Sequence, residues 1–451
     1  MSVTADSQRR RLSWGRTPRL APARVETPAW RSALPDLGAV GRPVLAYGQG
    51  RSYGDVCLNE GGVILDTRAL DRFIAFDREA GVVRCEAGVT LAQVLALVVP
   101  HGWFLPVTPG TKYVTVAGAV ANDVHGKNHH AAGTFGRFVT RLALRRSDGR
   151  TLELTPEAES PRNDLFRATV AGLGLTGFIE WVEFSLLPIQ SDEIEGRNTR
   201  FGSLEEFFAL SEEASGESPY VVSWVDALRP EGRGILMQGD HAATGGLPAP
   251  GDRPPQARLG LPADAPSWAL GPRTVRAFNA LYYGRQRPKR VEARSHYEPF
   301  FYPLDVARDW NRGYGRRGFY QYQFVVPFRD GTDAVREVLA RLAASGEGSF
   351  LAVLKTFGAV PSPGMMSFPR EGVTLALDLP NRGERTVRLL RACDAVVREA
   401  GGAVYPAKDA TMTPESFRAF FPQWEAFAAH IDPAFSSSFW RRVTGEGGSS
   451  Q

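Results

Sequence analysis

A glycine-rich stretch, GQGRSYGD at residues 48–55, has residue types suited to binding an anionic group. It follows the apolar run PVLAYG directly, so we expect a tight loop after a strand. Its glycines follow G-x-G-x-x-x-G, one residue longer than the dinucleotide fingerprint, and no amphipathic helix comes next, which argues against a Rossmann NAD site. Clustered backbone N–H groups, with Arg51 and Ser52, can instead wrap a pyrophosphate. A plain glycine-rich turn is the competing interpretation.

A second stretch, residues 109–136 (PGTKYVTVAGAVANDVHGKNHHAAGTFG), carries few bulky side chains. Small residues let a backbone come close to a flat or phosphate-bearing ligand. His125, Lys127, His129 and His130 then crowd one loop. Because HGKNHH has no carboxylate or thiolate at ordinary ligand spacing, we expect no metal site there.

A third glycine-rich segment, GLGLTGFIEWVEF at residues 172–184, leads into a strand. Alone, it is also consistent with a close-packed turn. Three small-residue loops within one part of the chain together favour a long cofactor lying across that part.

The elements that position these loops mix strands and helices. Short strands are predicted at residues 43–48 and 61–66, and Thr90 with Gln93 has capping-box spacing at the head of a helix that ends near Pro100. Asp148-Gly149 predicts a two-residue hairpin turn, and a strand that ends near Pro188 marks a boundary.

The second half repeats this mixture. QYQFVVPF (321–328) alternates as a strand does, TVRLLRACDAVVREAGG (386–402) is an amphipathic helix, and one helix from Glu415 to Phe427 is predicted to pack an aromatic stripe into a core. Residues 240–267, rich in Gly, Pro and Ala, are expected to form a mobile loop over a ligand site, with a plain surface linker as the alternative.

Size and composition limit the function classes. A chain of 451 residues is expected to form two domains, and a dispersed excess of four basic residues gives no reason to expect nucleic acid as a partner. Three scattered cysteines predict a reducing compartment and no disulfides. Neither a signal peptide nor a membrane span is predicted, and a basic cluster at residues 9–11 allows at most peripheral membrane association.

The three glycine-rich segments resemble the FAD-binding segments of the vanillyl-alcohol oxidase superfamily. Within it, the chain is most similar to the decaprenylphosphoryl-β-D-ribose 2'-oxidase family, with HGKNHH, FYPLD, WNRGYG, YQYQF, VLKTFG, MSFP and YPAKD in that family's order. The resemblance implies an α+β fold: a two-subdomain PCMH-type FAD-binding domain (1–188), a substrate domain with an antiparallel sheet (189–401), and a C-terminal segment (402–451) that returns to the FAD domain.

The resemblance also implies where FAD would bind. The expected cofactor residues are Gly48, Gly50, Arg51, Ser52, Tyr53, Gly54, Asp55, Gly110, Thr111, Thr115, Val116, Ala117, Gly118, His125, Gly126, Lys127, Asn128, Ile179 and Tyr405. Relatives with a covalently bound flavin commonly have a His where Arg51 stands. We therefore expect noncovalent FAD.

For the chemistry, the resemblance points to Lys408, Tyr405 and His125. A buried Lys408 with a lowered pKa can accept a hydroxyl proton, and its ammonium form can stabilise charge on the flavin; the sequence leaves both roles open. The implied substrate residues are Lys127, Trp224, Gln321, Gln323, Lys355 and Lys408. Alternation along a strand points both glutamines into one pocket, which suits sugar hydroxyls.

The implied reaction is oxidation of the 2'-hydroxyl of a polyprenylphosphoryl ribose in the cytoplasm, with a short-chain reductase as partner. Two departures from the family pattern bear on the substrate: Phe301 replaces a Tyr, with Tyr302 adjacent, and Ala376 stands where the mycobacterial form has Cys. A soluble alditol or aldonolactone oxidase that uses oxygen is the alternative. A flavin-binding protein without catalysis is a third hypothesis.

Overall fold

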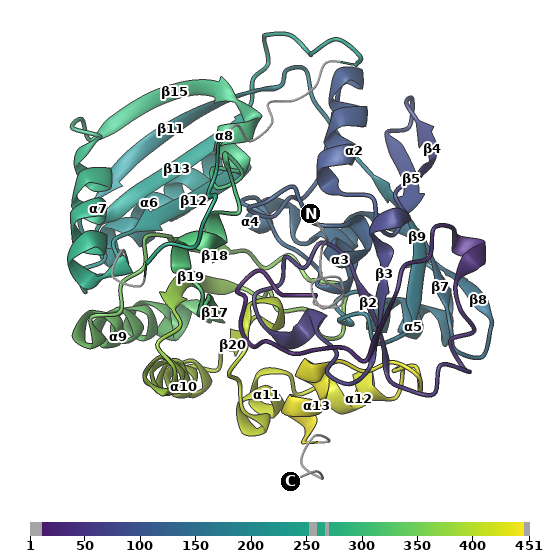
Figure 1. The fold of residues 1–451 in the computed structure, drawn as a ribbon. Coiled ribbons are helices and arrows are strands. Elements are labelled where there is room, and N and C mark those ends of the chain that lie inside the picture. The colour runs from purple at the N-terminus through teal and green to yellow at the C-terminus, as the bar shows by residue number, and fades with distance from the viewer. Residues whose placement is uncertain (1–10, 252–258, 267–269, 446–451) are drawn as a thin grey trace.

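The computed structural model describes residues 11–251, 259–266 and 270–445. It combines three main sheets with helices that cover them (Figure 1). The predicted α+β class is confirmed. Of the basic cluster at residues 9–11, only Arg11 lies within the described residues, where its Nε donates to Asp66 at 2.9 Å.

The N-terminal half contains a parallel three-stranded sheet and an antiparallel five-stranded sheet. The first has the order β1 (Arg24–Glu26), β3 (Val63–Asp66), β2 (Val44–Tyr47). The second has the order β4 (Phe73–Asp77), β5 (Val82–Glu86), β9 (Phe178–Ser185), β7 (Val139–Arg145), β8 (Thr151–Leu154). The helices here are α2 (Leu91–Val98), α3 (Val116–Ala121), α4 (His129–Ala132) and α5 (Arg162–Thr169), and β6 (Trp103–Phe104) pairs with β10 (Leu187–Pro188).

Local sequence signals explain several of these elements. The Thr90 side chain accepts from the Gln93 backbone and the Gln93 side chain caps Thr90, so the predicted capping box is confirmed. The predicted two-residue turn at Asp148-Gly149 is wrong. The backbone N–H of Arg146 donates to Arg150 O at 2.9 Å, so the loop between them has three residues. Gly149 in this loop has a φ of 83°.

The second half is built on an antiparallel sheet of eight strands. Its order is β15 (Arg290–His296), β11 (Glu193–Phe201), β13 (Gly234–His241), β12 (Tyr220–Val225), β18 (Ala352–Phe357), β19 (Gly372–Pro380), β17 (Phe319–Val326), β20 (Ala403–Val404). Helices α6 (Leu204–Glu217), α9 (Phe328–Ser345) and α10 (Glu384–Glu399) pack against it, and α7 (Pro272–Gly284) and α8 (Tyr297–Phe301) lie near β15 (Figure 1). Apolar residues of α9, α10, β17 and β19 share one core. The helices therefore cover one face of the sheet and leave the other face open.

The C-terminal helices join the two halves. The aromatic stripe lies in two helices, α11 (Pro414–Phe420) and α12 (Trp424–Ala428), because Phe421, which precedes Pro422, leaves the helical region with a φ of −129° and a ψ of 73°. The single helix predicted there is wrong, although its packing into the core is confirmed. Helix α13 (Ser438–Thr444) then packs against the short helix η2 (Asp55–Cys57), next to the GQGRSYGD loop.

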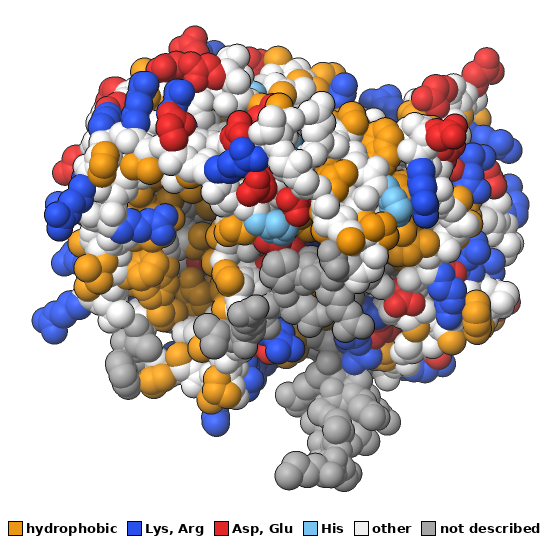
Figure 2. Space-filling view, turned by 90° about the horizontal axis from the view of Figure 1, so that it is seen from above, with side chains coloured by type: hydrophobic (Ala, Val, Ile, Leu, Met, Phe, Trp, Pro, Cys, Tyr) orange, Lys and Arg blue, Asp and Glu red, His pale blue; other side chains and the backbone are white. Residues whose placement is uncertain are grey.

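The segment at residues 240–267 is described only in part. Within that part, β14 (Leu259–Gly260) pairs with β16 (Ala307–Arg308), and Ala265 N–H donates to Arg312. Seen from above, one face of the molecule is hollowed, with hydrophobic side chains in the hollow and Lys and Arg side chains near its rim (Figure 2). None of the described helices has the length and hydropathy needed to cross a membrane.

Candidate active site

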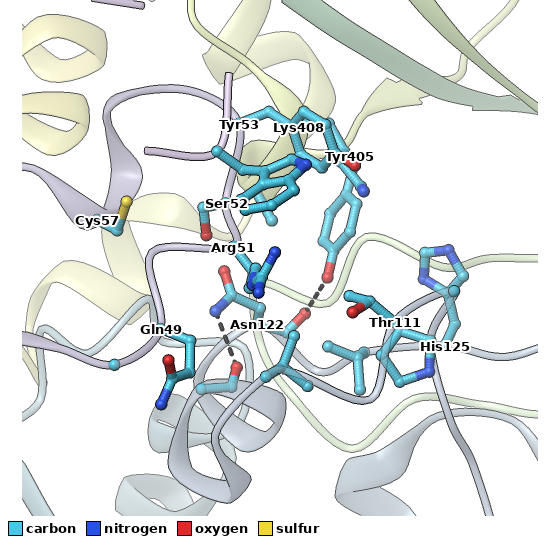
Figure 3. Close-up of a pocket in the computed structure, with 18 of the residues that line it drawn as sticks. Gln49, Arg51, Ser52, Tyr53, Cys57, Thr111, Asn122, His125, Tyr405 and Lys408 are labelled. Atoms are coloured by element: carbon cyan, nitrogen blue, oxygen red, sulfur yellow. Dashed lines mark hydrogen bonds between the residues drawn. The ribbon is translucent and has the colours of Figure 1, made fainter. Parts of the chain in front are cut away.

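A cavity of about 310 Å³ lies between the glycine-rich loops and the open face of the eight-stranded sheet. Its walls come from the loop after β2, from residues 108–127, from β17, β18 and β19, and from the turn at 405–408. Figure 3 shows that Lys408 and Tyr405, Arg51, and His125 approach it from three separate segments of the chain. The fold therefore gathers side chains that are far apart in the sequence.

The GQGRSYGD loop forms a wall with unpaired donors. Within the described residues, the backbone N–H groups of 49–52 donate to no protein acceptor. Arg51 Cζ lies 3.8 Å from the ring centroid of Trp14, and Arg51 Nε is buried without a hydrogen-bond partner. Burial lowers the pKa of Arg51. An anionic ligand such as a pyrophosphate would supply acceptors for these backbone N–H groups and for Arg51 Nε.

Small side chains give the cavity room for a flat ring system. A Cβ added at Gly110 would meet no atom within 4 Å, and Ala117, Gly118 and Ala121 of α3 line the cavity. Ile179 of β9 adds an apolar contact to the same cavity. These residues fit FAD, with the anion-binding loop at one end and an apolar slot beside it.

Three lysines line the cavity, although the whole chain contains only five. Among the described residues, no salt bridge joins Lys127, Lys355 or Lys408 to a carboxylate. Burial lowers the pKa of Lys127 to about 8. Burial, and then the nearby Lys127 and Lys408, hold the pKa of Lys355 well below its usual value, while its Nζ donates to Gly126 O at 2.8 Å. Such a cluster favours an anionic ligand.

His125 is held neutral beside Gln323. Burial, and then the positive charge of Lys355, lowers the pKa of His125 well below its usual value. Gln323 Nε2 donates to His125 Nε2 at 2.9 Å and to Thr374 Oγ1 at 3.2 Å. Because an amide nitrogen only donates, the imidazole proton lies on Nδ1, which has no partner.

Lys408 and Tyr405 enter from the short helix η8 (Pro406–Lys408) and the residue before it. Lys408 Nζ lies 4.1 Å from the Tyr53 ring centroid. Burial lowers the pKa of Lys408 to about 8, and the charge of Asp378 opposes that shift. The Tyr405 hydroxyl donates to Asn122 O at 2.8 Å, and its ring stacks on Phe368, so Tyr405 also fixes the backbone of the 109–136 segment (Figure 3).

The structure brings most of the predicted site residues to this cavity. They are Gly48, Gly50, Arg51, Ser52, Tyr53, Gly110, Thr111, Thr115, Ala117, Gly118, His125, Gly126, Lys127, Ile179, Gln321, Gln323, Lys355, Tyr405 and Lys408. The described part of residues 240–267 supplies none of the lining.

Five predicted residues do not line the cavity: Gly54, Asp55, Val116, Asn128 and Trp224. A Cβ at Gly54 would overlap Asp409 O at 1.6 Å, and Asp55 pairs with Arg442 at 2.7 Å, so both residues serve packing behind the loop. Val116 is fully buried in the core, and Asn128 Nδ2 donates to Pro106 O at 2.8 Å.

Trp224 was expected to form a wall against the substrate. It shares a strand face with Val222, which does line the cavity, but Tyr282 of α7 packs on it with ring centroids 4.7 Å apart. Its Nε1 donates to Phe350 O at 3.0 Å. Trp224 therefore supports the sheet at this position.

Sequence reasoning missed Trp14, Thr374 and Asp378. Trp14 carries the Arg51 stacking contact. Thr374, Ala376 and Asp378 alternate along β19, and in register they lie opposite Lys355, Gln323 and Gln321 respectively. Strand parity counted from Ala376 would have placed both polar residues on the cavity face.

The fold and this cavity define an FAD-dependent oxidoreductase with a PCMH-type FAD-binding domain. The family model of the FAD binding domain matches residues 30–155. A decaprenylphosphoryl-beta-D-ribose oxidase of Mycolicibacterium smegmatis is 35% identical over 457 residues, covering 96% of this chain and 97% of that protein. This chain belongs to the decaprenylphosphoryl-β-D-ribose oxidase family.

Two further relatives show how far the similarity extends. A Streptomyces coelicolor protein from the mprA 5' region is 33% identical over 375 residues, covering 79% of this chain and 100% of that protein. A candidate D-arabinono-1,4-lactone oxidase of Neurospora crassa is 32% identical over 148 residues, covering 33% of this chain and 26% of that protein.

The described residues contain no group of three or more His, Cys, Asp and Glu side chains placed to hold a metal ion.

Proposed function

We propose that this chain oxidises the 2'-hydroxyl of a polyprenylphosphoryl ribose to a ketone. The observation that carries the proposal is the cluster of Lys127, Lys355 and Lys408 in one cavity with two glutamines, beside the FAD-binding loops. A phosphate would neutralise the ammonium groups of Lys127 and Lys355, which make no salt bridge within the described structure, and the glutamines would bind sugar hydroxyls. The mycobacterial relative is named for a substrate with both groups.

We assign the role of proton acceptor to Lys408. Oxidising a carbinol removes a hydroxyl proton and a hydride, and bound FAD supplies the acceptor for the hydride. With a pKa of about 8, the Lys408 amine is partly neutral near physiological pH and can take the hydroxyl proton. Lys127 and Lys355 would hold the phosphate, and neutral His125 would fix the amide of Gln323.

We further propose that the FAD is bound without a covalent link. Arg51 occupies the loop position that matters for attachment, and its guanidinium is not a nucleophile. Flavin released by acid precipitation would support this proposal, whereas flavin retained in the pellet would contradict it.

The test follows the loss of flavin absorbance at about 450 nm when substrate is added to the purified flavoprotein without oxygen. We expect a short-chain polyprenylphosphoryl ribose to bleach the flavin and free alditols or aldonolactones to leave it oxidised. Bleaching by free alditols or lactones would favour the soluble sugar-oxidase alternative. No bleaching by any substrate would favour the non-catalytic hypothesis.

The remaining proposals concern partners and location. A 2-keto product requires a reductase to complete an epimerisation, so we propose a short-chain reductase as the partner. We also propose a cytoplasmic protein with at most peripheral membrane association. Co-purification with the reductase and co-sedimentation with anionic vesicles would test the two proposals.

A further inference from the structure

Asp378 lies next to the cavity, on the same face of β19 as Ala376, which lines it. It is on β19, directly opposite Gln321 of β17 in the sheet register, and its side chain is fully buried. It does not line the cavity, whereas Gln321 does. Any effect of Asp378 on a bound sugar must therefore act through a neighbouring side chain.

The first neighbour is the amide of Gln321. Its Nε2 donates to Asp378 Oδ1 at 2.5 Å, while its Oε1 is buried without a hydrogen-bond partner. Burial raises the pKa of Asp378 to about 7, and above that pH the ionised carboxylate can only accept hydrogen bonds. It then holds the Gln321 amide with its nitrogen toward β19 and its carbonyl oxygen turned away. A buried carbonyl oxygen without a donor is unfavourable, and a substrate hydroxyl can supply that donor.

The second neighbour is Lys408. It is the cation whose charge acts on Asp378, and the other titratable groups that face Asp378 are Tyr314 and Tyr53. Desolvation raises the pKa values of both tyrosines well above the usual value, so they stay neutral near physiological pH. The charges of Asp378 and Lys408 therefore act on each other beside the cavity.

We propose that Asp378 is a positioning residue for the reaction: it orients the Gln321 amide as a hydrogen-bond acceptor for a sugar hydroxyl, and its charge sets the proton affinity of Lys408. This role rests on the proposed sugar oxidation, and it assigns the Gln321 carbonyl oxygen to binding of a sugar hydroxyl. It predicts that the site favours a substrate with a free hydroxyl at the Gln321 carbonyl over the corresponding deoxy sugar, because the deoxy sugar leaves that oxygen unpaired.

The test uses Asp378→Asn in the FAD-loaded protein, with the short-chain polyprenylphosphoryl ribose as substrate. An asparagine at this position can donate as well as accept, so the Gln321 amide loses its fixed orientation. We expect the KM to rise about tenfold, the effect of one lost hydrogen bond. We also expect the acidic limb of the pH profile of flavin reduction to move to lower pH, because loss of the carboxylate charge lowers the pKa of Lys408.

Asp394→Asn is the matched control. Asp394 is a buried carboxylate that accepts from the Tyr322 hydroxyl at 2.9 Å, and burial raises its pKa to about 7, as it does for Asp378. Tyr322 points to the opposite face of β17 from Gln321, away from the cavity. This variant is expected to keep the wild-type KM and acidic limb.

Gln321→Met separates the two roles of Asp378 and keeps the proposal testable if Asp378→Asn does not fold. It is expected to raise KM similarly while leaving the acidic limb in place, and in the double variant the KM effects should not add. Wild-type KM in Gln321→Met, or an unmoved acidic limb in Asp378→Asn, would overturn the inference. Failure of the proposed function looks different: the wild-type flavin would then not be reduced by the phospholipid sugar at all.

Discussion

Lys408→Met removes the amine that the proposed reaction uses as its proton acceptor and keeps a side chain of similar length. Lys408 Nζ lies over the Tyr53 ring at 4.1 Å and makes no salt bridge within the described structure. Positioned general bases contribute about 10²- to 10⁴-fold to rates. We expect the rate constant of flavin reduction by substrate to fall by about that factor.

The wild-type pH profile follows from the same group. Burial lowers the pKa of Lys408 from 10.5 to about 8. The neutral amine is the active form of a base, so the rate should rise about 50-fold between roughly pH 6 and pH 8 and level off above about pH 9. If Lys408 instead stabilised flavin charge as an ammonium, the rate would fall as the pH rises through 8.

The Lys408→Met substitution should lower activity but not stability. A lysine whose folded pKa lies below its unfolded value destabilises the fold fully below the folded pKa, and the penalty disappears as pH rises toward the unfolded value. The drop from 10.5 to about 8 corresponds to about 3 kcal/mol at pH 7. Lys408→Met is therefore expected to melt at least as high as the wild type at pH 7.

The assay is anaerobic stopped-flow reduction followed through the flavin absorbance, with melting of the same samples. Lys289→Met is the control, because Lys289 is an exposed lysine paired with Glu206 on the surface. It should keep the wild-type rate and pH profile. A Lys408→Met protein that contains FAD and is reduced within about threefold of the wild-type rate would refute the assignment of the base, since general bases contribute far more than that.

Three further predictions concern the cofactor, the C-terminal helix and the pocket. Acid precipitation should release the flavin into the supernatant. A protein pellet that stayed yellow would contradict noncovalent binding. Arg442→Met should reduce stability by about 3–5 kcal/mol, because it leaves Asp55 and Asp409 buried without their cation; unchanged melting would argue against that reasoning. Ala376→Cys should place a thiol in the cavity that an electrophilic ligand can label, detected by peptide mass spectrometry, whereas the wild type should not be labelled at this position.

Much of the flavin side of the site could be read from the sequence because its signals are local. The GQGRSYGD loop needs only glycines at short spacing to expose its N–H groups, and the Thr90–Gln93 capping box closes within one turn of helix. The alternation in QYQF placed Gln321 and Gln323 on one face before any partner strand was known. The prediction of one helix from Glu415 to Phe427 failed because of one residue, Pro422, before which the first helix ends.

The substrate side depended on contacts between distant segments. Lys127, Lys355 and Lys408 come from a loop, a strand and a short helix, and only the packing of the sheet against the FAD-binding part brings them together. Trp224 had the right residue type and strand face, but Tyr282 of α7 covers it.

Strand alternation in LALDLP puts Asp378 on the same face as Ala376, but its pairing with Gln321 depends on the register of β17 against β19, which the sequence does not show. The sequence by itself thus determined which segments could bind FAD and which strand faces were polar. The tertiary structure alone decided which buried charges share a cavity, because desolvation and Coulomb interactions depend on distances in space and not on spacing along the chain.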